Sequence, residues 1–283
     1  IWSMEMSAPE IELIEAKDTL VFWPWELLKR QRAAIEEDFR GRGVGQVNGD
    51  VDARAILVEE TNMHIAAGAK VRAGAILDAS DGPILLEDGV EVMPGAVLLG
   101  PIAVGEKTKI NPGAKIHGPC SIGPVCKIGG EVEDTIIQGF SNKQHEGFLG
   151  HALLGEWVNL GADTNNSDLK NNYSAVSVVL EGESINTGET FFGSIIGDHV
   201  KTAINTQLNT GTVIGIGTNI FGAGFPPKAI GDFRWGGVEG FVSYDYEKFM
   251  GAARAAMKRR GLAPSSAMAT LLRSLHKESI SEM

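Results

Sequence analysis

The amino-acid sequence predicts a parallel β-helix with helical extensions at both ends. Aliphatic residues recur at an interval of six over much of the chain, and 36 glycines stand against only 3 tyrosines. A period of six fits neither an amphipathic helix nor a plain alternating strand. It fits a short strand followed by a turn, and glycine is favoured where the backbone turns tightly. Three such strands make a coil of about 18 residues, and stacked coils share one continuous core.

The period of six can be followed through most of the sequence. It begins at Ile65, Val71 and Leu77 and is displaced by three inserted residues at 80–82. It then runs unbroken through Leu86, Val92, Leu98, Val104, Ile110, Ile116, Ile122 and Ile128, and the residues four positions after each are Val90, Ala96, Ile102, Thr108, Ala114, Cys120, Cys126 and Val132. Phe148, Leu154 and Leu160 carry the series onward, and Ile196, Thr202, Leu208, Ile214 and Ile220 complete it. A β-sandwich is the alternative, but its strands would be longer and would not hold one spacing this far.

The chain divides into three predicted parts. Residues 1–45 form an extension in which 24–40 read as a helix, and the first residue, Ile1, indicates the tail of a longer protein. Residues 46–240 form the β-helix, with an excursion at 166–195 that breaks the period and indicates a function. Residues 241–283 read as two helices. The basic run from Lys258 to Arg260 is interpreted as a solvated helix end.

Composition excludes several classes of protein. A formal charge of -11 argues against a general nucleic-acid binder, so an anionic cofactor would need a local basic pocket. Cys120 and Cys126 lack a CxxC spacing and are predicted to be buried thiols in a reducing cytoplasm. Neither a membrane-spanning run nor a signal peptide is visible, so we expect a cytoplasmic protein that makes no membrane contact.

The segment GFSNKQHEGFLGHALLGEWVNLGADT, residues 139–164, places polar residues and two histidines in the repeat. His145 has three candidate roles, as a metal ligand, a structural corner residue or a general base. The other histidines are His64, His117, His151, His199 and His276. His151 lies six residues on, a span of up to about 20 Å, so the two histidines should project from different corners and one metal ion cannot easily join them.

A general base is the favoured role for His145, because imidazole titrates near neutral pH. Lys143, Asn159, Asn172 and Tyr173 are polar residues that could collect on its side of the coil. Trimeric β-helix carbonic anhydrases bind zinc with histidines of two subunits, so a shared metal site stays open. The sequence lacks the H-x4-H spacing of those enzymes, however, and no metal is predicted.

From His145 onward, HEGFLGHALLGEWVNLGADT resembles K-x-G-H-x-x-Y-L-G-x-A-x-I-G-x-x-V-N-I-G-A-G-T. That pattern belongs to the acetyltransferase half of the bifunctional enzyme that acetylates glucosamine 1-phosphate and then uridylylates the product. The whole chain, with DGPI near Asp81 and FRWGG near Trp235, is also similar to bacterial proteins assigned as sugar nucleotidyltransferases. The resemblance implies a left-handed β-helix, although the general crossover rule favours a right-handed one. It also implies a homotrimer with acetyl-CoA between neighbouring prisms.

The resemblance also assigns roles to residues. His145 would take the proton from the sugar amine as that amine attacks the thioester directly. On the substrate side, Lys143 matches approximately, Phe148 replaces a Tyr, Asn159 is kept, and Asn172 and Tyr173 match after a four-residue insertion. On the acetyl-CoA side, Ala162 keeps a backbone contact, and Ile204 and Gly222 replace Ser and Ala.

The sequence departs from the family in the residues that hold phosphate. Asn111 replaces the Arg of the R-P-G-A turn, which removes a bidentate contact of about 2 kcal/mol. Three hypotheses therefore stand. The first is an acetyl-CoA-dependent N-acetyltransferase acting on an amino sugar phosphate or nucleotide-sugar. The second is a non-catalytic module that binds a sugar nucleotide and forms trimers for a nucleotidyltransferase. The third is a γ-carbonic-anhydrase-like metalloenzyme.

Overall fold

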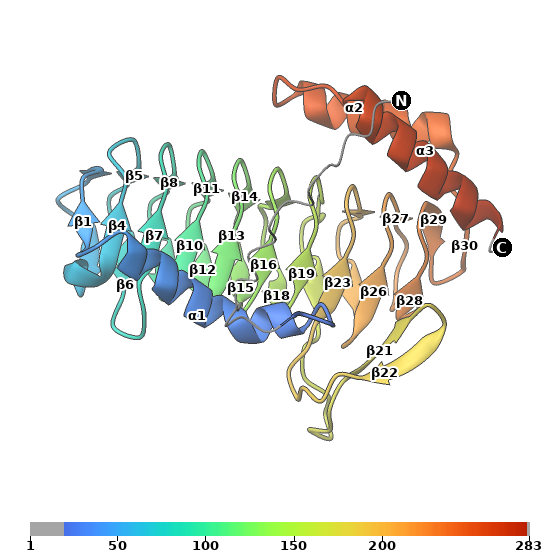
Figure 1. The fold of residues 1–283 in the computed structure, drawn as a ribbon, viewed down its shortest axis with the longest axis horizontal. Coiled ribbons are helices and arrows are strands. Elements are labelled where there is room, and N and C mark those ends of the chain that lie inside the picture. The colour runs from blue at the N-terminus through green and yellow to red at the C-terminus, as the bar shows by residue number, and fades with distance from the viewer. Residues whose placement is uncertain (1–19, 282–283) are drawn as a thin grey trace, which may run out of the picture.

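Short parallel strands stack in register along one axis in the computed structural model, which describes residues 20–281 (Figure 1). The predicted parallel β-helix is confirmed. Each coil contributes a strand to each of three faces, which we call A, B and C. Face A is a sheet of ten strands: β1 Gln46–Val47, β4 Met63–Ile65, β7 Ile84–Leu86, β10 Ile102–Val104, β13 Cys120–Ile122, β16 Ile136–Ile137, β19 Leu153–Leu154, β23 Ser194–Ile196, β26 Thr212–Ile214 and β28 Ala229–Ile230.

Faces B and C are each built from two sheets. Face B holds β2 Asp50–Val51, β5 Lys70–Val71, β8 Glu91–Val92, β11 Lys109–Ile110, β14 Lys127–Ile128 and β17 Asn142–Lys143, then β24 Lys201–Thr202, β27 Asn219–Ile220, β29 Arg234–Gly237 and β30 Gly240–Ser243. Face C holds β3 Ile56–Val58, β6 Ile76–Asp78, β9 Val97–Leu99, β12 Lys115–His117, β15 Glu131–Glu133 and β18 Phe148–Gly150, then β20 Asn165–Asn166 and β25 Gln207–Leu208. A 3-10 turn, η1 Glu60–Asn62, precedes β4.

The core is one apolar cluster that follows the axis of the prism. Every residue of the predicted series from Leu86 to Ile128 is buried, as are the residues four positions after each. Burying apolar surface contributes about 25 cal/mol of stabilising free energy per Å², which favours this fold over strands that remain exposed to water. Cys120 and Cys126 are free thiols in this core, and burial raises their pKa values to about 12 and about 11.

The predicted spacing fails by one residue at Phe148. Ile116 pairs with Val132, and Val132 pairs with Leu149, so Leu149 is the buried residue and Phe148 is half-buried. The physical reason is a short step from face C to face A, because Leu154 follows Leu149 by five residues, whereas Ile122 follows Ile116 by six. The prediction that Phe148 continues the core series is therefore wrong.

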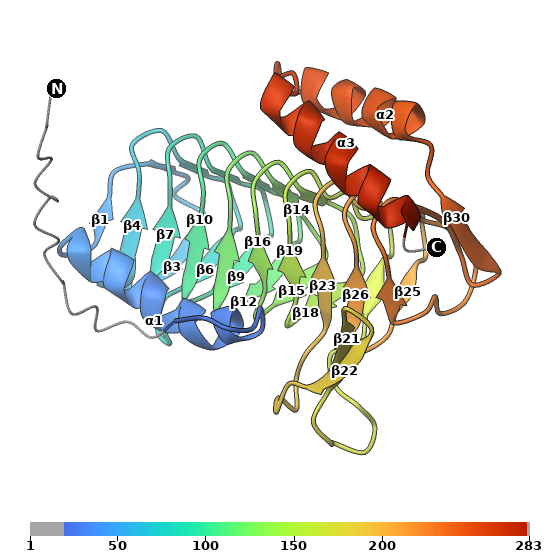
Figure 2. The ribbon, with the colours of Figure 1, turned by 45° about the vertical axis from the view of Figure 1, so that its right-hand side comes forward.

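A helix, α1 Glu26–Gly41, runs along the prism beside face A (Figure 1). Its first turn packs with the excursion, which forms an antiparallel hairpin of β21 Ser177–Leu180 and β22 Glu183–Asn186. Residues 1–19 of the predicted N-terminal extension lie outside the described residues. Figure 2 shows the hairpin projecting from the prism on the side away from the C-terminal helices.

The chain ends in two helices, α2 Tyr246–Lys258 and α3 Ser266–Ser281, which pack together through a separate apolar cluster that includes Phe233, Phe249 and Leu272. α2 turns back over the prism, so that Arg260, just after its last turn, donates a hydrogen bond to Asn142 at 3.0 Å. No helix among residues 20–281 is long and apolar enough to cross a membrane.

Candidate functional site

Four predicted site residues share one edge of the prism, the corner between faces B and C. Lys143 and Leu160 lie in register, as do Thr202 and Ile220, and the backbone bridge from Asn159 to Lys201 joins the two pairs. The residues two positions further along the chain are stacked in the same way: His145, Ala162, Ile204 and Gly222. Backbone hydrogen bonds cross the edge, including one from Asn205 to the carbonyl of Ala162 at 2.8 Å. The predicted base and the residues expected near acetyl-CoA therefore lie on neighbouring coils.

The His145 ring is exposed at this edge, and the amide nitrogen of Gln144 lies within hydrogen-bond distance, 3.1 Å from Nε2. An amide nitrogen can only donate, so Nε2 of His145 would be the acceptor in this contact. Gly147 turns the corner at φ 117°, and a Cβ there would lie 2.3 Å from the Thr164 carbonyl oxygen. The corner that presents His145 therefore requires a glycine.

Lys143 has a different setting from the one expected of a substrate-binding residue. Its side chain points into the core, in register with Ile128, and only 2% of the residue is exposed. Nζ donates to the carbonyl oxygens of Gly129, at 2.9 Å, and His145, at 2.6 Å. Burial lowers the pKa of this amine to about 8. Its donors hold the His145 corner from inside the prism, so we do not retain it among the substrate contacts.

The short corner below His145 makes room for this arrangement. Gly130 has φ 68°, and a Cβ there would lie 2.6 Å from the Lys143 nitrogen and 2.7 Å from the His145 carbonyl oxygen. Any larger residue would displace the amine or the corner above it. Asn111, one coil further down, supports the same corner, because its amide donates to the Gln144 carbonyl at 2.8 Å.

Asn159 and Phe148 flank the edge from opposite faces. Asn159 lies on face B, where its side-chain oxygen accepts a hydrogen bond from Asn142 at 3.2 Å. Phe148 lies on face C and lines a shallow hollow with Leu208 and Phe225. Ile204 is 67% exposed on the edge, and Gly222 is also exposed.

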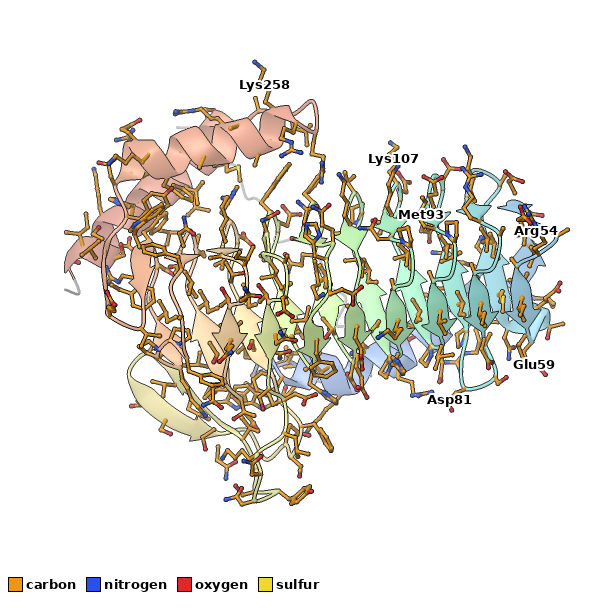
Figure 3. All side chains as sticks on the ribbon, turned by 180° about the vertical axis from the view of Figure 1, so that it is seen from behind. Arg54, Glu59, Asp81, Met93, Lys107 and Lys258 are labelled. Carbon is orange, nitrogen blue, oxygen red and sulfur yellow. The ribbon has the colours of Figure 1, made fainter. Side chains whose placement is uncertain are left out.

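Asn172 and Tyr173 are separate from this group. Both belong to the excursion, and Figure 3 shows the excursion on the opposite side of the prism from α2. Asn172 accepts hydrogen bonds from Ser174, and Tyr173 is 72% exposed. The structure therefore does not bring these two residues to Asn159 within one chain.

A cleft of about 310 Å³ lies between face B and the end of α2. Four cations line it, Lys127 and Lys201 from the prism and Arg259 and Arg260 from the two positions after α2, and we call it the basic cleft. Its other lining residues are Phe140, Asn142, Gln144, Trp157, Asn159, Ala255 and Ala256. Gln144 and Asn159 connect it to the His145 edge. The sequence interpretation missed this site, because the arginines looked like a solvated helix end until the fold placed them over face B.

His151 occupies a second polar cluster that sequence reasoning also missed. Its Nδ1 lies 2.8 Å from a carboxylate oxygen of Asp168, and its Nε2 lies 3.7 Å from one of Asp134. Burial lowers the pKa of His151, but the two carboxylates outweigh burial and the net shift is upward. The spacing in the sequence could have revealed this cluster, because Asp134 and Asp168 each lie 17 residues, about one coil, from His151. Among residues 20–281, no three His, Cys, Asp or Glu side chains are placed to hold a metal ion.

Comparisons with known proteins point to one group of enzymes. No family model matches the chain. It is 34% identical over 97 residues to a bifunctional sugar-1-phosphate nucleotidylyltransferase/acetyltransferase of Sulfurisphaera tokodaii, covering 34% of this chain and 24% of that protein. It is 32% identical over 85 residues to the bifunctional protein GlmU of Methanococcus aeolicus, covering 30% of this chain and 20% of that protein.

A solved structure adds little to these matches. The N-acyltransferase AntD from Bacillus cereus, crystallised as a point mutant with dTDP-4-amino-4,6-dideoxyglucose and coenzyme A, aligns with 79% of this chain and 96% of that one. Its identity is 14% and its TM-score 0.23, too low to support an assignment. The matched segments span about a quarter of the curated relatives. The resemblance that the sequence predicts, to bifunctional sugar-1-phosphate nucleotidylyltransferase/acetyltransferases, is confirmed over about a third of this chain.

Proposed function

We propose that this chain is an acetyl-CoA-dependent N-acetyltransferase that acts on an amino sugar phosphate or a nucleotide-sugar. The observation that carries the proposal is the shared edge, where the exposed His145 imidazole lies in register with Ala162, Ile204 and Gly222. The acetyltransferase named among the relatives supports the class of reaction.

The reaction needs one base and no covalent enzyme intermediate. The amine nitrogen attacks the thioester carbon, a C–N bond forms, and the C–S bond breaks. His145 takes a proton from the attacking nitrogen and returns it to the departing thiolate. To act through Nε2, the imidazole exchanges its contact with Gln144 for the amine. Cys120 and Cys126 are buried and take no part.

The substrates would approach this edge from its two sides. Asn159 would hold the sugar from face B, and Phe148 would pack against it from face C. We propose a homotrimer in the cytoplasm, with acetyl-CoA in the groove between neighbouring prisms. The 67% exposure of Ile204 supports a further surface that covers this edge. Asn172 and Tyr173 would then contact a substrate only across the subunit interface.

A non-catalytic sugar-nucleotide-binding module is the second candidate. Asn111 favours it, because this residue replaces a phosphate-binding Arg and its amide already bonds to the Gln144 carbonyl. The γ-carbonic-anhydrase-like hypothesis has no such observation in its favour among the described residues.

An acetyl-transfer assay separates the first two candidates. The wild-type protein is offered acetyl-CoA with a panel of amino sugars, amino sugar phosphates and nucleotide amino sugars, and free thiol is measured. We expect His145→Ala to lower turnover about 10²- to 10⁴-fold, as loss of a general base does, while coenzyme A still binds. The half-buried His64 on β4 provides the control, since His64→Ala should leave turnover unchanged. If no amine gives thiol release, or if His145→Ala is as active as wild type, the proposed mechanism is wrong.

A further inference from the structure

The basic cleft concentrates positive charge on a chain whose formal net charge is -11. Among the described residues, none of its four cations lies within 4.0 Å of a carboxylate, whereas Arg42 at the end of α1 and Arg72 and Lys109 on the prism all do. Like charges brought together repel one another, and a partly desolvated site strengthens that repulsion. The proximity of the four cations is therefore unfavourable in the protein without a ligand, and a bound anion would offset their repulsion.

The protein supplies few competing partners for these cations. Arg260 donates to Asn142 at 3.0 Å, but its Nε is buried and has no hydrogen-bond partner among the described residues. Lys201 has one long contact, 3.5 Å to the His199 carbonyl. Burial lowers the pKa of Lys201, and burial together with Arg260, Arg259 and Lys109 lowers that of Lys127.

A helix end alone does not explain the arrangement. Cations after the last turn of α2 stabilise the helix through its dipole, which accounts for Lys258 and Arg259 in part. It does not account for Lys127 and Lys201, which come from two different strands of face B and face α2 across the cleft. Figure 3 shows Lys258 projecting away from the prism, on the outer side of α2.

Two aromatic side chains, Phe140 and Trp157, also line the cleft. Phe140 and Trp157 stack with their ring centroids 4.4 Å apart and their planes 4° apart. Behind them lies His199, whose pKa burial lowers to about 4, so that it adds no positive charge at neutral pH. The positive charge of the cleft therefore comes from the two lysines and the two arginines, and the cleft reaches Gln144 and Asn159 near His145.

We propose that the basic cleft binds the diphosphate group of a substrate through its four cations. Guanidinium groups make bidentate contacts to phosphate oxygens, and ammonium groups act as point charges beside them. This site would bind phosphate in place of the Arg that Asn111 replaces. Coenzyme A and a nucleotide-sugar both carry a diphosphate. The inference rests on the proposed function for that choice of ligands, but binding itself requires no acetyl transfer.

Calorimetric titration of the full chain with inorganic pyrophosphate tests the proposal. Wild type should bind, and Arg259→Gln with Arg260→Gln together should weaken binding at least about tenfold, because charge-assisted contacts are lost. Lys258→Gln removes one charge from the same helix end outside the cleft, and it should leave affinity within about twofold. Equal affinities in wild type and the double variant, or an equal loss in Lys258→Gln, would overturn the proposal.

A second variant is needed because Arg260 also bonds to Asn142, so its removal could weaken binding by detaching α2 from the prism. Lys201→Gln alters the cleft from the prism side and should weaken pyrophosphate binding while α2 stays attached. Competition then identifies the source of the diphosphate. Displacement of pyrophosphate by coenzyme A assigns the site to the donor, and displacement by UDP assigns it to a nucleotide-sugar. Displacement by neither overturns the proposal. His145→Ala should bind pyrophosphate normally, so loss of turnover and loss of the anion site can be told apart.

Discussion

His145 and His151 stand six residues apart on neighbouring corners of one coil, yet their surroundings differ in almost every respect. His145 is exposed and contacts one neutral amide. The His151 side chain is 18% exposed, has a carboxylate near each ring nitrogen and stacks on Phe191 at 5.2 Å. The repeat makes the two corners equivalent, so it cannot be the cause of this difference.

The difference comes from the elements added to the repeat. The excursion supplies Asp168 and Phe191 to the His151 corner, and α1 supplies Gln31, which donates to Asp134 at 2.7 Å. The His145 corner is left open beside the basic cleft beneath α2. The regular coils thus place side chains at equivalent corners, and the elements added to the repeat determine which corners are covered and which remain accessible to a ligand.

Removing His151 should have the largest effect on stability. We expect His151→Ala to lower the free energy of unfolding by about 2–4 kcal/mol, because Asp134 and Asp168 would lose the imidazole that lies between them. Denaturant unfolding measures this, with His117→Ala on β12 as the control. A loss below about 0.5 kcal/mol would contradict the structural role.

The same cluster should respond to pH. The folded pKa of His151 lies above its ordinary value, since Asp168, Asp134 and Glu133 together outweigh burial. Its contribution to stability is therefore complete below about pH 6.5 and is lost as pH rises through the higher folded value. Arg32 and Gln31 are the other groups on α1 that face Asp134. The protection factors for amide hydrogen exchange in the excursion, which correct for the faster intrinsic exchange at higher pH, should accordingly fall as pH rises through that folded value.

Lys143, which lies inside the prism below the His145 corner, should have a somewhat smaller effect on the free energy of unfolding. Its folded pKa of about 8 lies below the unfolded value of 10.5, so between these values the unfolded chain binds the proton more tightly. The free energy of unfolding should therefore rise with pH, by about 2 kcal/mol between pH 8 and 10. Lys143→Met should lack this rise, whereas Lys70→Met, at an exposed position of face B, should keep it. The same slope in Lys143→Met and wild type would show that the amine is not the cause.

Asn111 should show the smallest effect. Asn111→Ala removes one hydrogen bond to the Gln144 carbonyl, for which we expect a loss of about 1 kcal/mol in the free energy of unfolding. Thermal unfolding followed by calorimetry measures the change. Asn48→Ala, at an exposed corner of the first coils, is the matched control. If both variants unfold alike, the Asn111 bond does not support the His145 corner.

The hexad series predicted the fold because an aliphatic residue at every sixth position indicates a side chain that points into the core. From Leu86 to Ile128 all of these residues are buried. It failed at Phe148, because the step from Leu149 on face C to Leu154 on face A takes five residues and not six. It did not include Lys143, because an amine there takes the place of an aliphatic side chain. The edge from His145 to Gly222 was predictable from motif resemblance. The basic cleft was not, because Arg260 meets Asn142 across 118 residues and no local pattern encodes that approach.

The central claim is that His145, and not its counterpart on the next corner, moves the proton in acetyl transfer. The most direct measurement compares the turnover number for thiol release, with the best amine of the panel, in His145→Ala and His151→Ala at a temperature where both remain folded. The account predicts a loss of about 10²- to 10⁴-fold for His145→Ala and less than about tenfold for His151→Ala. Equal losses, or a larger loss for His151→Ala, would contradict it.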